Sequence, residues 1–136
     1  MMRFLLSTFV IILATTLTQA QVTKEKEKAI HHYVKGERQL EVANYNKAIV
    51  HYEEALFWFA QDPSVEDSHY VQSWLSLAYS YASTGDTTTS LFFVEKALDR
   101  FDQANLWDEE KWKKILSDTY RINGLDKKAE KILARL

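Results

Sequence analysis

The sequence contains no cysteine, one proline and three glycines among its 136 residues. Without cysteine, the fold cannot depend on disulfides or thiolate metal sites, and no lipid-modified cysteine can follow an export signal. An all-β fold of this length needs many turns, which glycine and proline most often form. Their scarcity therefore favours a helical chain with room for one domain or one compact array of repeats.

A strong charge of either sign is also missing. The formal net charge is -2, from 17 basic and 19 acidic residues. Proteins that bind nucleic acids usually carry a basic excess on one face, and none is evident, so no nucleic-acid partner is predicted. The composition is that of a folded protein, because 46% of the residues are hydrophobic and 13% aromatic. Disordered chains are poor in both kinds.

The first twenty residues have the order of a secretory signal peptide. Residues 1–3 give a short positive start, residues 4–17 are mainly apolar, and residues 18–20 end in a small residue. The apolar stretch is shorter than the roughly 20 residues that a helix needs to cross a bilayer, so no stable membrane span is expected after cleavage. We expect residues 1–20 to be removed and residues 21–136 to form an exported domain, periplasmic or secreted. An uncleaved anchor and a buried N-terminal helix are the alternatives.

Six helices are predicted in the rest of the chain. Their expected ends lie near Val42, Ala60, Ser83, Phe101, Ile122 and the C-terminus. The residues that suit N-terminal caps of the second to fifth helices are Asn44, Ser64 (with Asp67 as a capping box), Asp86 or Thr87, and Asn105. Gly85 and Gly124 suit the left-handed position that follows a helix end. The predicted fold is therefore all-α, with six helices in three antiparallel hairpins.

The three hairpins share a pattern when Ala48, Ser90 and Ala129 are aligned. Small residues recur where the two helices of a hairpin would cross, as at Gly36, which precedes Ala48 by 12 residues. The second hairpin has the fullest set of large residues, in the run WLSLAYSY at 74–81. This pattern resembles the tetratricopeptide repeat, W-x2-L-G-x2-Y, then Gly, then A-x3-F-x2-A. The resemblance implies a short solenoid of about three hairpins.

The spacing of the hairpins departs from that family. The aligned small residues are separated by 42 and 39 positions, against about 34 in the family. The surplus falls between hairpins, at residues 59–69 and 102–108, where longer helices or loops are expected. Another kind of helix–turn–helix array is the alternative interpretation.

No converging set of catalytic groups is evident in the sequence. The glycines are isolated, so they form no phosphate-binding loop, and there is no G-x-S-x-G motif. Acidic clusters at 53–54 and 108–110 are better explained as solvated faces, and the second cluster also by the helix dipole. We therefore predict that the chain is not an enzyme and needs no cofactor. An enzyme with a hidden pocket would be the least favoured class.

Four histidines are scattered along the chain. His31 and His32 are neighbours, so on a helix they point roughly 100° apart and cannot chelate one metal together. His51 and His69 lack a partner at zinc-binding spacing. No metal site is predicted from this spacing.

The tetratricopeptide resemblance also implies a binding surface, because in that family the first helix of each hairpin lines a concave face that binds peptides. The positions carried over are Ile30, Tyr33, Glu37, Leu40, Gln72, Leu75, Tyr79, Lys111, Lys114, Asp118 and Arg121. One end of this surface would be apolar and the other partly basic, which suits a peptide or helix with an apolar stripe and some acidic character. The alternative is that Tyr33, Leu75 and Tyr79 only pack between hairpins.

Phe57, Trp58 and Phe59 are three consecutive aromatic residues at a predicted helix end. Successive helical residues turn by about 100°, so the three cannot all face one core. We expect Trp58 to pack into the second hairpin, and at least one of the others to be exposed or covered by the long connector. An exposed aromatic patch often marks an interface; packing against the connector is the alternative.

These features predict a non-catalytic scaffold or adaptor that binds another protein or a peptide outside the cytoplasm. The alternative function is structural self-association, because a short array leaves an uncovered end. The polar residues of the last predicted helix include Lys127, Lys128, Glu130, Lys131 and Arg135. They favour a solvated cap over open stacking.

Overall fold

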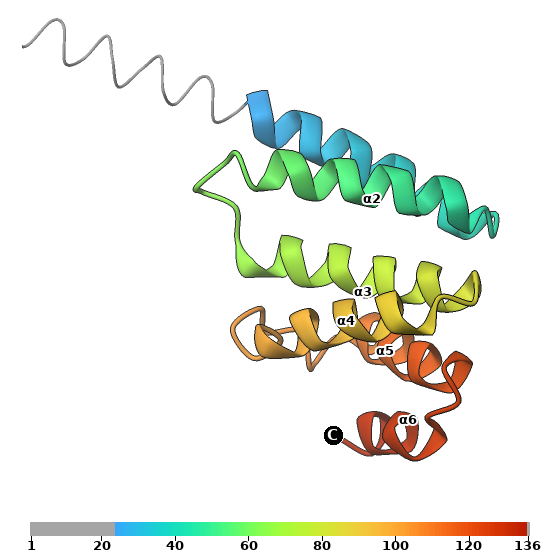
Figure 1. Cartoon of the computed structure of the whole chain (residues 1–136). Coiled ribbons are helices and arrows are strands. Elements are labelled where there is room, and N and C mark those ends of the chain that lie inside the picture. The colour runs from blue at the N-terminus through green and yellow to red at the C-terminus, as the bar shows by residue number, and fades with distance from the viewer. Residues whose placement is uncertain (1–23, 136) are drawn as a thin grey trace, which may run out of the picture.

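The computed structural model describes residues 24–135, so the predicted signal peptide lies outside the described residues. This part of the chain is all-α and contains no strand (Figure 1). Its helices are the first helix (24–41), α2 (Tyr45–Phe59), α3 (Asp67–Ser83), α4 (Thr87–Asp99), α5 (Glu110–Ile122) and α6 (Asp126–Leu133). The all-α prediction is confirmed. None of these helices combines the length and the apolar character needed to cross a membrane.

Successive helices run antiparallel and are stacked in chain order, from the first helix and α2 at the top of Figure 1 to α6 at the bottom. α3 lies at the centre of the stack, where it packs against α2, α4 and α5, while α5 also packs against α6. The first helix is tied to α2 by the Tyr52 hydroxyl, which donates to Glu37 Oε1 over 2.5 Å. This order places the first helix, α3 and α5 next to one another.

Small residues mark the crossing of the two helices in each hairpin, as predicted. In the first hairpin, a Cβ placed on Gly36 would lie 2.9 Å from the Tyr52 ring, so only glycine permits this approach. In the second, the buried Ser90 hydroxyl donates to the carbonyl of Ala78 over 2.7 Å. In the third, the Ser117 hydroxyl donates to the carbonyl of Ala129 over 3.3 Å. The second and third contacts each join residues 12 positions apart, whereas Gly36 and Tyr52 are 16 positions apart.

The main hydrophobic core is built around α3, α4 and α5. Its buried members are Val71, Trp74, Leu75, Ala78, Val94, Ala97, Phe101, Leu106, Trp112, Leu116, Tyr120 and Ala129. Two smaller clusters attach the first hairpin: one contains Ala29, Ala55 and Phe59, and the other contains Ala48, Tyr52 and Leu77. The second and third hairpins therefore share one core, and the first hairpin packs against it through α2.

Two predicted helix starts are wrong. Ser64 does not cap α3, because the Asp62 carboxylate accepts hydrogen bonds from both the backbone N–H and the hydroxyl of Ser64, over 2.8 and 2.7 Å. Those bonds form a turn, and the helix begins three residues later at Asp67. Asn105 does not cap α5 either, since it adopts a left-handed φ of 53° and the helix begins at Glu110. The intervening connector instead buries Leu106 in the core.

The other helix ends agree more closely with the residues predicted to form them. Gly85 and Gly124 have φ values of 88° and 76°, which confirms the left-handed conformation predicted for them. The Asp86 carboxylate caps α4 by accepting a hydrogen bond from the Thr89 N–H over 3.0 Å, and this bond lowers the pKa of Asp86. Asn44 occupies the N-terminal cap position of α2, but its side chain makes no capping hydrogen bond.

Candidate functional site

The first helix, α3 and α5 present most of the predicted groove residues on one face, which we call the groove face. Two hollows lie along it. The first, of about 350 Å³, is the charged hollow, lined by Glu37, Leu40, Glu41, Tyr79, Lys111, Lys114, Ile115 and Asp118. The second, of about 220 Å³, is the aromatic hollow, lined by Ile30, Tyr33, Phe59, His69 and Gln72. The structure thus brings nine of the eleven predicted residues to these two hollows.

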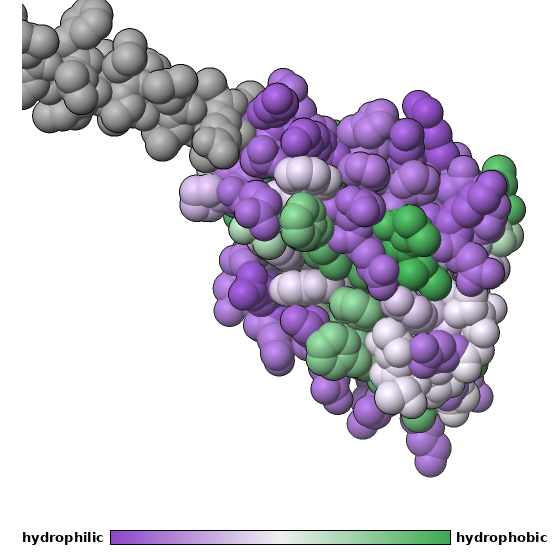
Figure 2. Space-filling view, turned by 45° about the horizontal axis from the view of Figure 1, so that its top comes forward, coloured by the Kyte–Doolittle hydropathy of each residue, from purple (hydrophilic) through white to green (hydrophobic). Residues whose placement is uncertain are grey.

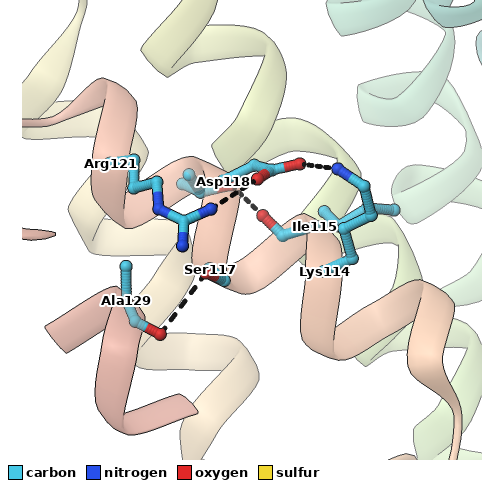
Figure 3. A network of polar contacts seen from close by, with 7 residues as sticks. Lys114, Ile115, Ser117, Asp118, Arg121 and Ala129 are labelled. Carbon is cyan, nitrogen blue, oxygen red and sulfur yellow. Dashed lines mark hydrogen bonds and ion pairs between the residues drawn. The ribbon is translucent and has the colours of Figure 1, made fainter. Parts of the chain in front are cut away.

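One ion pair crosses the charged hollow between helices, and two more lie along α5. Lys111 Nζ lies 3.1 Å from Glu37 Oε2, which joins α5 to the first helix over 74 positions in the sequence. Within α5, Asp118 lies between Lys114, with Nζ 2.6 Å from Oδ2, and Arg121, with Nη1 3.5 Å from Oδ1 (Figure 3). The Lys114 side chain is 73% exposed and that of Asp118 only 27%. The cations therefore form the outer layer of this hollow, and the carboxylates lie beneath them.

The Glu37 carboxylate is the centre of a polar network that joins several helices. Besides Lys111, its carboxylate accepts hydrogen bonds from the Tyr52 hydroxyl of α2 and from the Ser76 hydroxyl of α3, the latter over 3.4 Å. Burial raises the pKa values of Tyr33 and Tyr52 well above their usual range, and the adjacent Glu37 carboxylate raises them further. Both phenols therefore remain protonated donors. One carboxylate thus contacts side chains from α2, α3 and α5.

The aromatic hollow is mainly apolar. Phe59 is buried at its floor, with its ring centroid 5.3 Å from that of His69. Nδ1 of His69 is buried and has no hydrogen-bond partner among the described residues. Tyr33 lines this hollow, and its ring also packs on that of Tyr52, with centroids 5.7 Å apart. The Tyr52 hydroxyl in turn donates to Glu37. The hollow can accept an apolar or aromatic side chain.

Two predicted groove residues do not line either hollow. Leu75 is fully buried in the main core, so it cannot contact a partner, and the prediction that it lies on the groove surface is wrong. α3 is packed against three other helices, and Leu75 points into that packing rather than outward. Arg121 is exposed at the end of α5, where its contact is with Asp118. It flanks the charged hollow without lining it.

The aromatic run divides in a different way from the one predicted. Phe59, not Trp58, packs towards the second hairpin, where its ring lies 6.2 Å from that of Tyr70. Trp58 is half-buried and covers the first helix, with Lys28 Nζ 3.9 Å above its ring. Phe57 is exposed, which confirms that at least one of the three faces solvent. The prediction that Trp58 is the buried residue is therefore wrong. The buried side chain is that of the next residue, which points about 100° further around the helix.

Several hollow residues were not among the groove residues predicted from the sequence. Glu41 and Ile115 lie four positions after Glu37 and Lys111 respectively, on the same helical faces. Helical spacing could therefore have found both. Phe59 and His69 enter the aromatic hollow from the end of α2 and the start of α3, on either side of a long connector. No spacing rule in the sequence links them to Ile30.

Exposed apolar residues also occur away from the groove face. Val50 and Phe57 on α2, and Phe92 on α4, are each more than half exposed. We call them the outer apolar residues. Figure 2 shows one face of the molecule, on which hydrophobic residues form separate patches among hydrophilic ones. Next to Val50 and Phe57 lie two carboxylates, Glu53 and Glu54. These patches are smaller and more interrupted than a continuous apolar interface.

Residues 24–135 contain no group of three or more His, Cys, Asp or Glu side chains placed to hold a metal ion. The sequence matches no protein-family model, no curated protein and no solved structure.

Proposed function

We propose that this chain is an exported, non-catalytic adaptor of the tetratricopeptide type, whose groove face binds an apolar and acidic segment of a partner protein. One observation carries this proposal. Side chains from the first helix, α2, α3 and α5 line two neighbouring hollows, one aromatic and one charged. The 12-residue spacing shared by the second and third hairpin crossings supports the repeat interpretation, and the signal-like residues 1–20 support export.

The chemistry of the partner follows from the order of charges in the charged hollow. Lys111 and Lys114 are more exposed than Glu37 and Asp118, to which they are paired. A partner approaching from solvent therefore meets the ammonium groups first. Exposed ion pairs of this kind contribute only about 0–1 kcal/mol to stability, so a carboxylate of the partner can share or replace the internal acid at small cost. An acidic residue is favoured at this end of the partner segment.

The other end of the segment should be apolar. Ile30 is exposed at the rim of the aromatic hollow, and Phe59 is buried at its floor. Filling such a hollow with an apolar side chain removes surface from water on both partners, which contributes about 25 cal/mol for each Å² of apolar surface buried. The proposed ligand is thus a segment with one large apolar residue followed or preceded by an acidic one.

Peptide selection on the immobilised full chain tests this proposal. A displayed random peptide library should enrich sequences that combine a large apolar residue with Asp or Glu. Binding of an enriched peptide is then measured by fluorescence anisotropy. The double variant Tyr79→Ala, Lys114→Glu is expected to weaken binding by about 30-fold, the equivalent of about 2 kcal/mol for an interface hot spot.

The matched control changes the other side of the molecule. Val50→Ser with Phe92→Ser removes two outer apolar residues and is expected to leave the dissociation constant within about twofold. Far-UV circular dichroism confirms that both double variants are folded. A peptide that loses affinity for the control and retains it for the groove variant would overturn the groove assignment. Self-association through the outer apolar residues would instead appear as a concentration-dependent mass in light scattering that the control variant abolishes.

Ionic strength provides a second prediction. Raising the salt from about 0.1 M to about 1 M shortens the Debye length from about 10 Å to about 3 Å. Because the cations of the charged hollow are exposed, binding of an acidic selected peptide should weaken over this range. Lys114→Gln should reduce that dependence, while Lys127→Gln on α6 should leave it unchanged. A dissociation constant that does not change with salt would show that apolar contacts alone account for binding.

A further inference from the structure

The first helix and α2 cross closely at Gly36, and one helical turn away this crossing brings two histidines together. His32 precedes Gly36 by four residues, and His51 precedes Tyr52 by one. Since the helix axes approach closely where Gly36 meets Tyr52, these two imidazoles come together although they are 19 residues apart in the sequence. Their Nδ1 atoms are 3.5 Å apart and their ring centroids 5.8 Å apart.

A hydrogen bond explains this contact poorly. Nitrogen donors and their acceptors are usually 2.7–3.2 Å apart, and 3.5 Å is beyond that range. A metal ion between the two atoms fits the distance better. Two imidazole nitrogens at about 2.0–2.1 Å from a tetrahedral ion are separated by about 3.3–3.4 Å. The observed separation therefore needs to change by only about 0.1–0.2 Å, which is within the tolerance of such sites.

We propose that His32 and His51 form a two-imidazole binding site for a divalent late transition-metal ion, with water in its remaining positions. Imidazole is a good ligand for Zn²⁺, Ni²⁺ and Cu²⁺, and affinity in this series is highest for Cu²⁺. With two protein ligands the site binds metal reversibly and links the first helix to α2. This inference is independent of the groove face, because neither histidine lines either hollow.

The groups around the pair are compatible with metal binding. Burial lowers the pKa of His51, and His32, Lys35 and His31 lower it further, whereas Glu54 acts in the opposite direction. The neutral imidazole, which is the form that binds metal, is therefore favoured at His51. Lys35 also repels a bound cation, which keeps the affinity modest, and the carboxylate of Glu54 offsets part of that repulsion.

His31 offers a matched control for this site. It lies next to His32 on the first helix and is exposed, but its ring is at 77° to that of His32, with centroids 5.7 Å apart. Neighbouring helical residues point about 100° apart, so His31 does not share the same ion. Because the chain has no cysteine, thiolate binding cannot obscure the result.

The test is isothermal titration of the untagged full chain with Zn²⁺, together with thermal unfolding in the presence and absence of the ion. The wild type and His31→Gln should bind one ion and melt at a higher temperature when it is present. His32→Gln and His51→Gln should each bind about tenfold more weakly or worse, and should lose that rise in melting temperature. Glutamine keeps the helical propensity and polarity at these half-buried positions.

Two further measurements make the result decisive. Circular dichroism without metal must show the same helix content in all four proteins, and Cu²⁺ electron paramagnetic resonance should show coupling to two nitrogen atoms in the wild type and to fewer in His51→Gln. Equal Zn²⁺ affinity in all four proteins would overturn the proposal. So would the absence of binding by the wild type at about 1 mM Zn²⁺, the weak end of specific association.

Discussion

Replacing Phe101 with alanine is expected to lower the free energy of unfolding by about 3–5 kcal/mol, which is typical for removal of a buried phenylalanine. Phe101 is 0% exposed and packs in the main core, with its ring centroid 4.3 Å from that of Trp107. It lies in the connector between α4 and α5, so the loss would show that this connector is part of the core. Urea unfolding followed by far-UV circular dichroism measures the effect.

Phe92→Ala is the matched control, because Phe92 is a phenylalanine of the neighbouring α4 that is 52% exposed. Its expected cost is below about 1 kcal/mol, as is usual for surface substitutions. Small domains have a total stability of about 5–15 kcal/mol, so Phe101→Ala removes a large share of it. If that variant does not fold, Phe101→Leu provides a smaller and measurable loss. Equal costs for Phe92→Ala and Phe101→Ala would contradict the burial of the connector.

Gly36→Val is expected to destabilise the fold by about 1–3 kcal/mol, because the added side chain would overpack the crossing between the first helix and α2. The new Cβ would lie 2.9 Å from the Tyr52 ring. That ring is fully buried and its hydroxyl is bonded to Glu37, so it cannot move aside freely. Removing a glycine from a helix gains at most about 1 kcal/mol, and less for a β-branched residue. The steric cost therefore exceeds the gain.

Arg38→Val separates the two effects of that substitution. Arg38 is exposed on the same helix, so valine there changes helix propensity without filling a crossing. Its cost should be a few tenths of a kcal/mol, roughly the difference between arginine and valine in helix propensity. Thermal unfolding of both variants against the wild type provides the comparison. A Gly36→Val protein as stable as Arg38→Val would show that the hairpin tolerates a wider crossing.

The sequence predicted the helices better than the connectors. The predicted ends at Val42, Ala60, Ser83 and Ile122 lie within one residue of the observed ends of their helices, because apolar periodicity and glycine signals act locally. The starts of α3 and α5 were wrong because each depends on a competing interaction. The Asp62 side chain forms its own turn in one case, and burial of Phe101 and Leu106 holds the connector in the other.

The groove face was predicted in part for a similar reason. Positions such as Ile30, Glu37 and Leu40 share one face of one helix, and local spacing determines that face. Leu75 was misplaced because α3 is covered on several sides, which depends on helices far along the chain. The approach of His32 to His51 could not be predicted either. The two histidines meet because the first helix and α2 cross closely at Gly36. Their separation of 19 residues in the sequence gives no sign of that crossing.

The contact between Lys111 and Glu37 reaches from the third hairpin back to the first, across the intervening α3. An exposed ion pair of this strength, about 0–1 kcal/mol, is comparable to thermal energy. This ion pair therefore opens and closes readily, while burial around α3 keeps the helices of the main core packed. We therefore expect the distance between the first helix and α5 on the groove face to vary more than the distances within the main core.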